Sequence, residues 1–113
     1  MRPFRTMVVT FLAAGSLAFS ASISRAATSA NGADIFREKC SMCHGTNGKG
    51  YAAIKTPNFT DPKWQAAHSD KELMNAIENG VKGTAMVSFK GKLTHEQMVA
   101  VLKYIRSLGT KKK

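Results

Sequence analysis

Two cysteines and a histidine stand close together in the first half of the chain, at Cys40, Cys43 and His44. Two thiols separated by two residues, with an imidazole directly after them, form the attachment pattern of a c-type haem. On one helical turn, the thiols can form thioethers with two vinyl groups on one edge of a porphyrin. His44 would then lie under the iron, where a neutral imidazole is a common axial ligand. The motif therefore predicts one covalently attached haem.

Other uses of a Cys-x-x-Cys pair fit the sequence less well. A thioredoxin-like pair requires a βαβ context and a thiolate of lowered pKa, and no strand pattern flanks this motif. A structural zinc site needs four ligands, and the chain has 2 cysteines. A disulfide would close a tight loop that constrains little of the unfolded chain. None of these explains His44, although a haem-free dithiol oxidoreductase stays open as an alternative.

Met86 is the candidate for a second axial ligand of the iron. It lies near the centre of a predicted loop over residues 81–93, a length at which a structureless connection in a small domain usually has a function. A thioether on such a loop can approach the iron from the side opposite His44 and raises the reduction potential relative to bis-histidine ligation. The rival ligands occupy the attachment turn, predicted helical faces or helix starts; they are Met42, Met74, Met98, His68 and His95.

The elements that must position these residues read as helices joined by loops. A first helix, capped by Asn31, is expected to run into Cys40. Capping boxes at residues 69–72 and 94–97 predict two further helices, which end at Asn79-Gly80 and at Gly109. Residues 45–61 read as an extended loop. No alternating run is long enough for a strand, so the expected fold is all-α.

The two terminal helices are expected to cross each other. Gly32 and Phe36 on the first helix would face Tyr104 and Ile105 on the last, and a glycine at position 32 would permit a close approach. Fewer than a hundred residues bury only about 60% of the unfolded surface. A buried porphyrin would therefore supplement a thin core.

The first 26 residues have the features of a secretory signal peptide. Arg2 and Arg5 precede a mostly apolar stretch, and small residues precede the expected cleavage after Ala26. The apolar run is shorter than the roughly 20 residues of a bilayer-spanning helix, which disfavours a retained anchor and stable membrane insertion. The expected domain is residues 27–113, with 111–113 as a flexible basic tail. Export would place the protein in the periplasm or otherwise outside the cytoplasm.

The exported chain is basic. Of 17 basic residues, 14 remain after the signal, against 7 acidic residues, so the net charge is +7. Five lysines lie in loops expected near the haem, namely Lys49, Lys55, Lys82, Lys90 and Lys92. They would steer the protein toward redox partners with acidic docking surfaces, and they also fit an ordinary solubilising surface. Export argues against nucleic acid as a partner.

Several segments together resemble small bacterial class I c-type cytochromes, over residues 31–108. The resemblance rests on the attachment motif and on residues before and after it. These are Gly32, Phe36, Gly48-Lys49-Gly50, Pro57, Asn79-Gly80, Gly83 to Met86, Phe89 and Tyr104 to Leu108. One position departs from the family, because Val87 stands where a proline usually follows the ligand methionine.

This resemblance implies three to five helices packed around one haem c, with thioethers at Cys40 and Cys43 and axial ligation by His44 and Met86. It further implies that the Pro57 carbonyl accepts a hydrogen bond from the His44 ring, although Pro57 also fits a role as a loop stiffener. Trp64 could donate its indole N–H to a haem propionate or serve as a core aromatic.

The expected function is that of a soluble, monomeric one-electron carrier and not of an enzyme. With both axial positions filled by protein, the iron has no open site for substrate. The alternative is a gas-binding or peroxidatic haem protein, in which Met86 is labile or absent from the iron.

Overall fold

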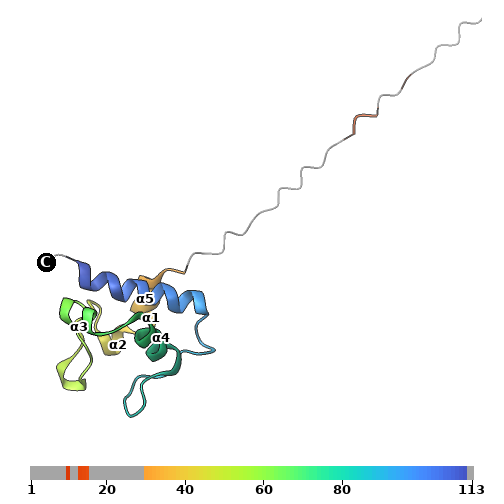
Figure 1. Cartoon of the computed structure of the whole chain (residues 1–113). Coiled ribbons are helices and arrows are strands. Elements are labelled where there is room, and N and C mark those ends of the chain that lie inside the picture. Colours follow the sequence, from red (N-terminus) through yellow and green to blue (C-terminus); the bar gives the residue numbers. More distant parts are fainter. Residues whose placement is uncertain (1–9, 11–12, 16–29, 112–113) are drawn as a thin grey trace, which may run out of the picture.

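The computed structural model describes residues 10, 13–15 and 30–111. In this part of the chain the elements follow the order α1 (Gly32–Lys39), α2 (Ser41–His44), the 3-10 turn η1 (Ala52–Ile54), α3 (Pro62–Ala67), α4 (Asp70–Asn79) and α5 (His95–Thr110) (Figure 1). An isolated bridge between Lys90 and Leu93 is the one strand-like pairing in the described ranges. The predicted all-α fold is confirmed.

The two predicted segments at the ends of the chain lie mostly outside the described residues. Most of the signal peptide over residues 1–26 is not described, nor are Lys112 and Lys113 of the basic tail. Lys111 is described, and its ammonium nitrogen lies 5.5 Å from the centre of the Tyr104 ring. Within the described part of the chain, every helix is too short or too polar to cross a bilayer.

Helices α1 and α5 cross in direct backbone contact at Gly32 (Figure 1). A Cβ atom on Gly32 would lie 2.1 Å from the carbonyl oxygen of Ala100, so no side chain fits between the helices there. One turn along both helices, the rings of Phe36 and Tyr104 lie 5.2 Å apart. The predicted crossing is confirmed, and so is the contact between Phe36 and Tyr104. Gly32 itself contacts Ala100 and not Tyr104. Ala100 lies one turn before Tyr104 on α5, just as Gly32 lies one turn before Phe36 on α1.

Helix α3 directly follows the predicted loop over residues 45–61, in a stretch for which the sequence predicted no element. The Asp61 side chain accepts a hydrogen bond from the Lys63 N–H at 2.9 Å, and Pro62 occupies the first helical position. An aspartate cap followed by proline is a helix start signal, because proline lacks only an N–H that would have no helical partner anyway. This short helix places Trp64 and Gln65 beside the core.

The capping boxes of α4 and α5 form as predicted. Ser69 Oγ accepts from the Glu72 N–H at 3.2 Å, while Glu72 Oε2 accepts from the Ser69 N–H at 3.0 Å. Thr94 and Gln97 make the same reciprocal pair, at 3.1 and 2.8 Å. Each box satisfies two N–H groups that a helix start leaves without partners.

Two predicted helix ends shift by one residue, while the third is correct. Helix α4 ends at Gly80, whose φ of 73° no longer continues the helix. Helix α5 continues through Gly109 to Thr110, since Gly109 does not take the positive φ that would end it. Helix α1 ends before Cys40, where the backbone turns to a φ of −120°.

The core lies where α1, α4 and α5 meet. Its buried apolar residues come from these helices and from the two long loops; they are Phe36, Phe59, Leu73, Ile77, Phe89, Leu93, Met98, Val101, Leu102, Ile105 and Leu108. No polar or charged residue of the described chain is buried among them. The core is small, as the chain length predicts.

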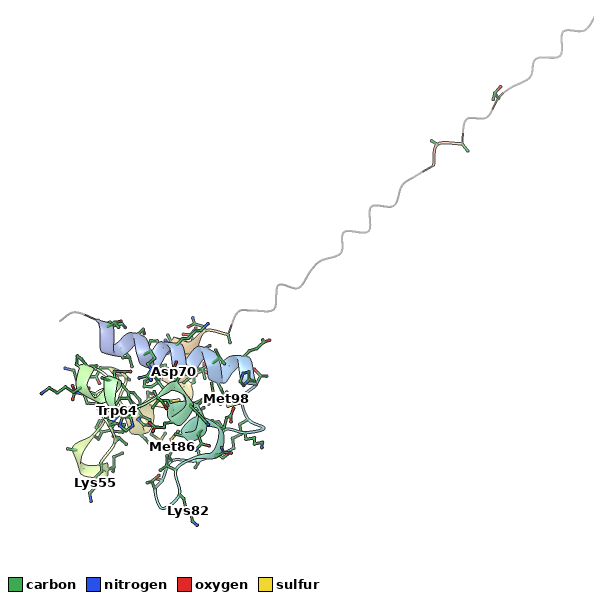
Figure 2. All side chains as sticks on the ribbon, viewed as in Figure 1. Lys55, Trp64, Asp70, Lys82, Met86 and Met98 are labelled. Atoms are coloured by element: carbon green, nitrogen blue, oxygen red, sulfur yellow. The ribbon has the colours of Figure 1, made fainter. Side chains whose placement is uncertain are left out.

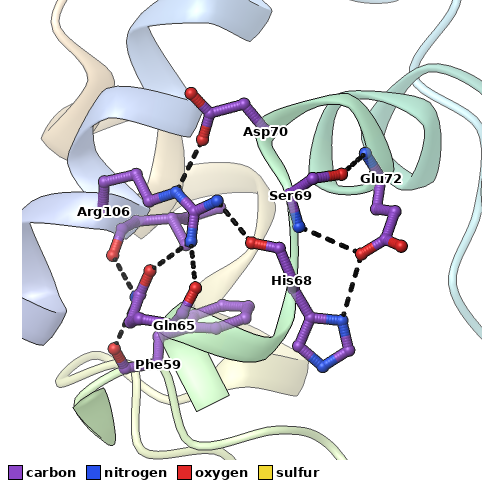
Figure 3. Close-up of polar contacts among 8 residues, drawn as sticks. Phe59, Gln65, His68, Ser69, Asp70, Glu72 and Arg106 are labelled. Carbon is purple, nitrogen blue, oxygen red and sulfur yellow. Dashed lines mark hydrogen bonds and ion pairs between the residues drawn. The ribbon is translucent and has the colours of Figure 1, made fainter. Parts of the chain in front are cut away.

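Arg106 on α5 joins α3 and the start of α4 to the last helix (Figure 3). Its guanidinium donates to Asp70 Oδ1 at 2.7 Å, to the backbone and side-chain oxygens of Gln65 at 2.8 Å each, and to the His68 carbonyl at 2.6 Å. Gln65 in turn donates to the Phe59 carbonyl at 2.7 Å. The position of the Phe59 loop therefore depends on a planar cation that binds several acceptors at once.

Replacing Gly32 with alanine should lower the free energy of unfolding by about 1–3 kcal/mol. The added methyl group would overlap the Ala100 carbonyl and push α1 away from α5. A urea titration of the haem-loaded protein, followed by far-ultraviolet circular dichroism, measures the change. Lys39→Ala, at an exposed position of the same helix, should stay within about 0.5 kcal/mol of the original protein. Equal midpoints for Gly32→Ala and Lys39→Ala would contradict the close packing.

Candidate functional site

The attachment motif forms a single tight turn directly after α1. The Cys40 N–H donates to the Phe36 carbonyl at 2.9 Å, and the Cys40 carbonyl accepts from the His44 N–H at 3.0 Å. Cys40 is half-buried and Cys43 is exposed. The crossing of α1 and α5 therefore sets the position of both thiols and of the imidazole that follows them.

Both cysteines are free thiols in the structure. Burial, with a smaller contribution from the neighbouring Cys43, raises the pKa of Cys40 to about 11. A dithiol oxidoreductase requires the opposite shift, because the thiolate is the attacking species. The environment of Cys40 thus does not resemble that of a redox-active thiol pair.

The His44 ring lies against the core, where it stacks on Phe59. The two ring centres are 4.8 Å apart with an interplanar angle of 21°, and the Phe36 ring lies 6.4 Å from the His44 ring at an angle of 46°. Burial lowers the pKa of His44, since loss of water disfavours the imidazolium form. The ring is therefore held neutral, which is the form that binds a metal ion.

One nitrogen of this ring, Nδ1, is buried without a hydrogen-bond partner. It is the one such side-chain atom recorded among the described residues. Leaving a buried polar atom unsatisfied costs about 1–3 kcal/mol, so such an atom points to a group outside the polypeptide. A neutral, buried imidazole with an unsatisfied nitrogen, next to two free thiols, fits a covalently attached haem with His44 as an iron ligand.

Pro57 lies near this turn, but its predicted contact is absent from the structure. Its carbonyl oxygen faces Gly50, where an added Cβ atom would come within 2.5 Å of it. Gly50 also donates its N–H to the His44 carbonyl at 2.8 Å. Since Nδ1 of His44 has no partner, the expected bond from the ring to the Pro57 carbonyl is not formed here. The role of Pro57 in orienting the ring stays a prediction.

Met86 occupies the loop between α4 and α5 and is half-buried against the core (Figure 2). Its carbonyl accepts from the Val81 N–H at 3.3 Å, and its N–H donates to Thr84 Oγ1 at 3.1 Å. The backbone on both sides of the thioether is thereby fixed.

The rival sulfur and nitrogen ligands have other surroundings. Met42 points to solvent with 90% of its surface exposed, whereas Met98 is 6% exposed inside the core. Met74 packs partly buried against the same core. The His68 ring lies 4.5 Å from the Trp64 ring in a tilted arrangement, and the His95 side chain is 72% exposed. None of these arrangements favours one of them over Met86.

Trp64 lies on α3 between two other rings. Its centre is 4.9 Å from that of Phe59 and 4.5 Å from that of His68. Because Phe59 also stacks on His44, Trp64 is part of the aromatic layer that covers the motif. Its proposed contact with a haem propionate stays a prediction.

Sequence reasoning missed Phe59, which makes the closest ring contact with His44. A lone phenylalanine in a loop has no periodicity that would indicate its role. The signal that could have found it is indirect: Asp61-Pro62 starts α3, and α3 fixes the loop that carries Phe59 through Gln65.

Comparisons with known proteins agree with this site. The family model described as cytochrome c matches residues 29–109. Cytochrome c6 of Nostoc sp. is 33% identical over 105 residues, which are 93% of this chain and 92% of that protein. The Cbb3-type cytochrome c oxidase subunit FixP of Bradyrhizobium sp. is 39% identical over 80 residues, 71% of this chain. This chain spans only about a quarter, 27%, of that FixP subunit.

Among solved structures, the KustC0563 c-type cytochrome is similar at a TM-score of 0.64 and 30% identity, with 69% of this chain and 96% of that chain covered. The dihydro-heme d1 dehydrogenase NirN is similar at a TM-score of 0.60 and 25% identity, over 68% of this chain and 16% of NirN.

The matched region contains every residue of the candidate site, from Cys40 to Met86. The buried imidazole, the two free thiols and the helical fold agree with the family match and with the predicted cofactor, a covalently bound haem c. From its sequence, its fold and its relatives, the chain belongs to the cytochrome c family.

Proposed function

We propose that this protein is a soluble one-electron carrier that works outside the cytoplasm, with one haem attached to Cys40 and Cys43. The observation that carries the proposal is the half-buried, neutral imidazole of His44, whose Nδ1 is buried without a partner, directly after two free thiols. His44 is one axial ligand in this proposal, and Met86 is the other. The family relation supports electron transfer as the general activity.

The residues of the chain have separate tasks in this proposal. Bound haem supplies a reversible one-electron couple between ferric and ferrous iron. His44 and Met86 would both hold the iron, which would leave no site for a substrate on the metal. Phe36 and Phe59 exclude water from one face of the imidazole and keep it neutral. Thioether bonds at Cys40 and Cys43 hold the group in both oxidation states.

A lysine-rich end of the molecule supports docking to acidic redox partners. Lys55 and Lys82 stand at the tips of the two loops that project from the same end, away from α5 (Figure 2). The Met86 loop also carries Lys82 and Lys90. A positive field at this end would attract a partner over a distance of about one Debye length, roughly 8 Å at physiological salt.

A second candidate role is suggested by the oxidase subunits among the relatives. The FixP proteins are named as subunits of Cbb3-type cytochrome c oxidases, and one of them is 39% identical to this chain. In that role the same haem domain would pass electrons within an oxidase assembly. Isolation of the tagged protein from its own cells distinguishes the two roles, since an oxidase subunit would co-purify with other haem-containing subunits.

The other alternative is a haem protein with an open or labile sixth position, which would bind gases or peroxide. Val87 in place of proline is the sequence feature that favours it. A visible spectrum of the oxidised and reduced protein, made in cells with haem-attachment machinery, decides between these readings. A low-spin spectrum with the sulfur-to-iron charge-transfer band in the oxidised form supports ligation by Met86. A high-spin spectrum would overturn it.

The Met86→Ala variant should retain its haem but bind carbon monoxide and imidazole readily. Loss of the thioether leaves the sixth position open, whereas the thioether bonds at Cys40 and Cys43 are unaffected. Binding is measured from the shift of the main haem absorption band on titration. Met42→Ala, at an exposed position, is the matched control and should stay unreactive. Unchanged reactivity of Met86→Ala would point to Met74, Met98 or a histidine instead.

The haem-free double variant Cys40→Ala/Cys43→Ala should be largely unfolded. The described core is small, and the buried His44 nitrogen has no partner within the protein, so the polypeptide depends on its cofactor for stability. Limited proteolysis and a thermal scan followed by circular dichroism test this expectation. A cooperative thermal transition in the haem-free variant would show that the polypeptide core is sufficient.

Electron transfer with an acidic partner should slow as ionic strength rises, and charge reversal at Lys49, Lys82 or Lys90 should lower its bimolecular rate. These lysines lie in the loops around the site, so they contribute to attraction at close range. Stopped-flow kinetics at low salt gives the rates. Lys111→Glu, at the far end of α5, is the control and should have a smaller effect. A larger effect at Lys111 would mean that partners dock on a different face.

A further inference from the structure

One hydroxyl group, that of Thr84, makes hydrogen bonds to both ends of the segment that carries Met86. Thr84 Oγ1 accepts a hydrogen bond from the Met86 N–H at 3.1 Å and donates one to the Val81 carbonyl at 2.7 Å. The Thr84 N–H donates to the same Val81 carbonyl at 3.1 Å. A single side chain therefore links the first and last residues of the six-residue segment 81–86.

The carbonyl side of Met86 is fixed by the end of α4. The Val81 N–H donates to the Met86 carbonyl at 3.3 Å, so Val81 and Met86 face each other across the loop. Gly80 makes this approach possible, because a Cβ atom there would lie 2.6 Å from the Met86 carbonyl oxygen. Both backbone groups of Met86 are thus bound within the loop itself.

The next residues attach the loop to α4. The Phe89 N–H donates to the Ile77 carbonyl at 3.0 Å, and the Lys90 N–H donates to the Glu78 carbonyl at 3.1 Å. Between these anchors and Thr84 stands Val87, which is 53% exposed. Residues 81–85 are likewise exposed, so apolar packing does little to order them. Ordering such a segment costs backbone entropy, and local hydrogen bonds must offset that cost.

We propose that Thr84 is the positioning residue for Met86: its hydroxyl holds the backbone of the ligand loop in the conformation from which the thioether reaches the iron. The inference rests on the proposed function, since it assumes that Met86 is the second axial ligand.

The size of the effect follows from competition at the iron. An external ligand such as imidazole must displace Met86, so its apparent affinity rises as the bound conformation of the loop becomes less populated. An ordinary intramolecular hydrogen bond contributes about 1 kcal/mol, which corresponds to roughly a fivefold change in an equilibrium constant. Loss of the Thr84 hydroxyl should therefore raise the apparent affinity for imidazole about three- to tenfold.

The experiment compares Thr84→Val with Thr84→Ser in the oxidised, haem-loaded protein. Valine keeps the branched shape and removes the hydroxyl, whereas serine keeps the hydroxyl and should restore binding to nearly the original level. Imidazole is titrated, and the main haem absorption band reports displacement of the thioether. Thr110→Val removes an exposed threonine hydroxyl at the end of α5, which bonds only to the Ser107 carbonyl, and should leave the titration unchanged.

Amide hydrogen exchange distinguishes a local role of Thr84 from a general loss of stability. Amide hydrogen exchange at Met86 should quicken in Thr84→Val, while exchange in α1 and α5 should be unaffected. Equal imidazole affinity in Thr84→Val and in the original protein would overturn the proposal. So would a Thr84→Ser variant as reactive as Thr84→Val, because the hydroxyl would then not be the cause.

The Met86→Ala variant separates this inference from the function on which it rests. If Met86→Ala binds imidazole readily and Thr84→Val does not, the ligand assignment stands and the role of Thr84 is wrong. If Met86→Ala is as unreactive as the original protein, the assignment of Met86 fails, and the inference about Thr84 fails with it.

Discussion

The structure depends on one imidazole that the polypeptide buries but does not satisfy. His44 is pressed against Phe59, is held neutral by desolvation and has a ring nitrogen without a partner. A protein core normally pairs such an atom, because leaving it unpaired costs free energy on folding. A metal ion can bind one ring nitrogen while a carbonyl such as that of Pro57 accepts from the other, so both nitrogens can be satisfied in the loaded protein. The family relation identifies the cofactor as haem c.

The parts of the fold that surround His44 set its position in two independent ways. The backbone contact between Gly32 and Ala100 brings α1 against α5, and α1 leads directly into the attachment turn. On the other side, the guanidinium of Arg106 holds Gln65, and Gln65 holds the carbonyl of Phe59. Helix α5 is common to both. A single long helix thus fixes the chain before the histidine and the ring that stacks on it.

Much of this could be predicted from the sequence, because the strongest signals are local. The two capping boxes, the Asn31 cap and the attachment motif each depend on residues three or four positions apart, and all are found where expected. Long-range features were harder. The contact of Phe59 with His44 depends on a short helix and a bonded glutamine, and neither leaves a periodic pattern. Gly109 shows why residue type alone did not predict the end of α5. A glycine ends a helix where its φ becomes positive, and the φ of Gly109 does not.

The two long loops at the site are held by local hydrogen bonds in addition to the burial of Phe59, Phe89 and Leu93. In the first, Thr56 Oγ1 accepts from the Tyr51 N–H at 2.7 Å and Asn47 accepts from the Lys49 N–H at 3.0 Å; in the second, Thr84 has the equivalent task. Short polar side chains that bond to nearby backbone groups order a loop without using core volume. A domain of this size has little apolar surface to spare, because most of its buried apolar residues lie on α1, α4 and α5. Local hydrogen bonding is therefore the means by which so small a protein can order the exposed parts of its two long loops.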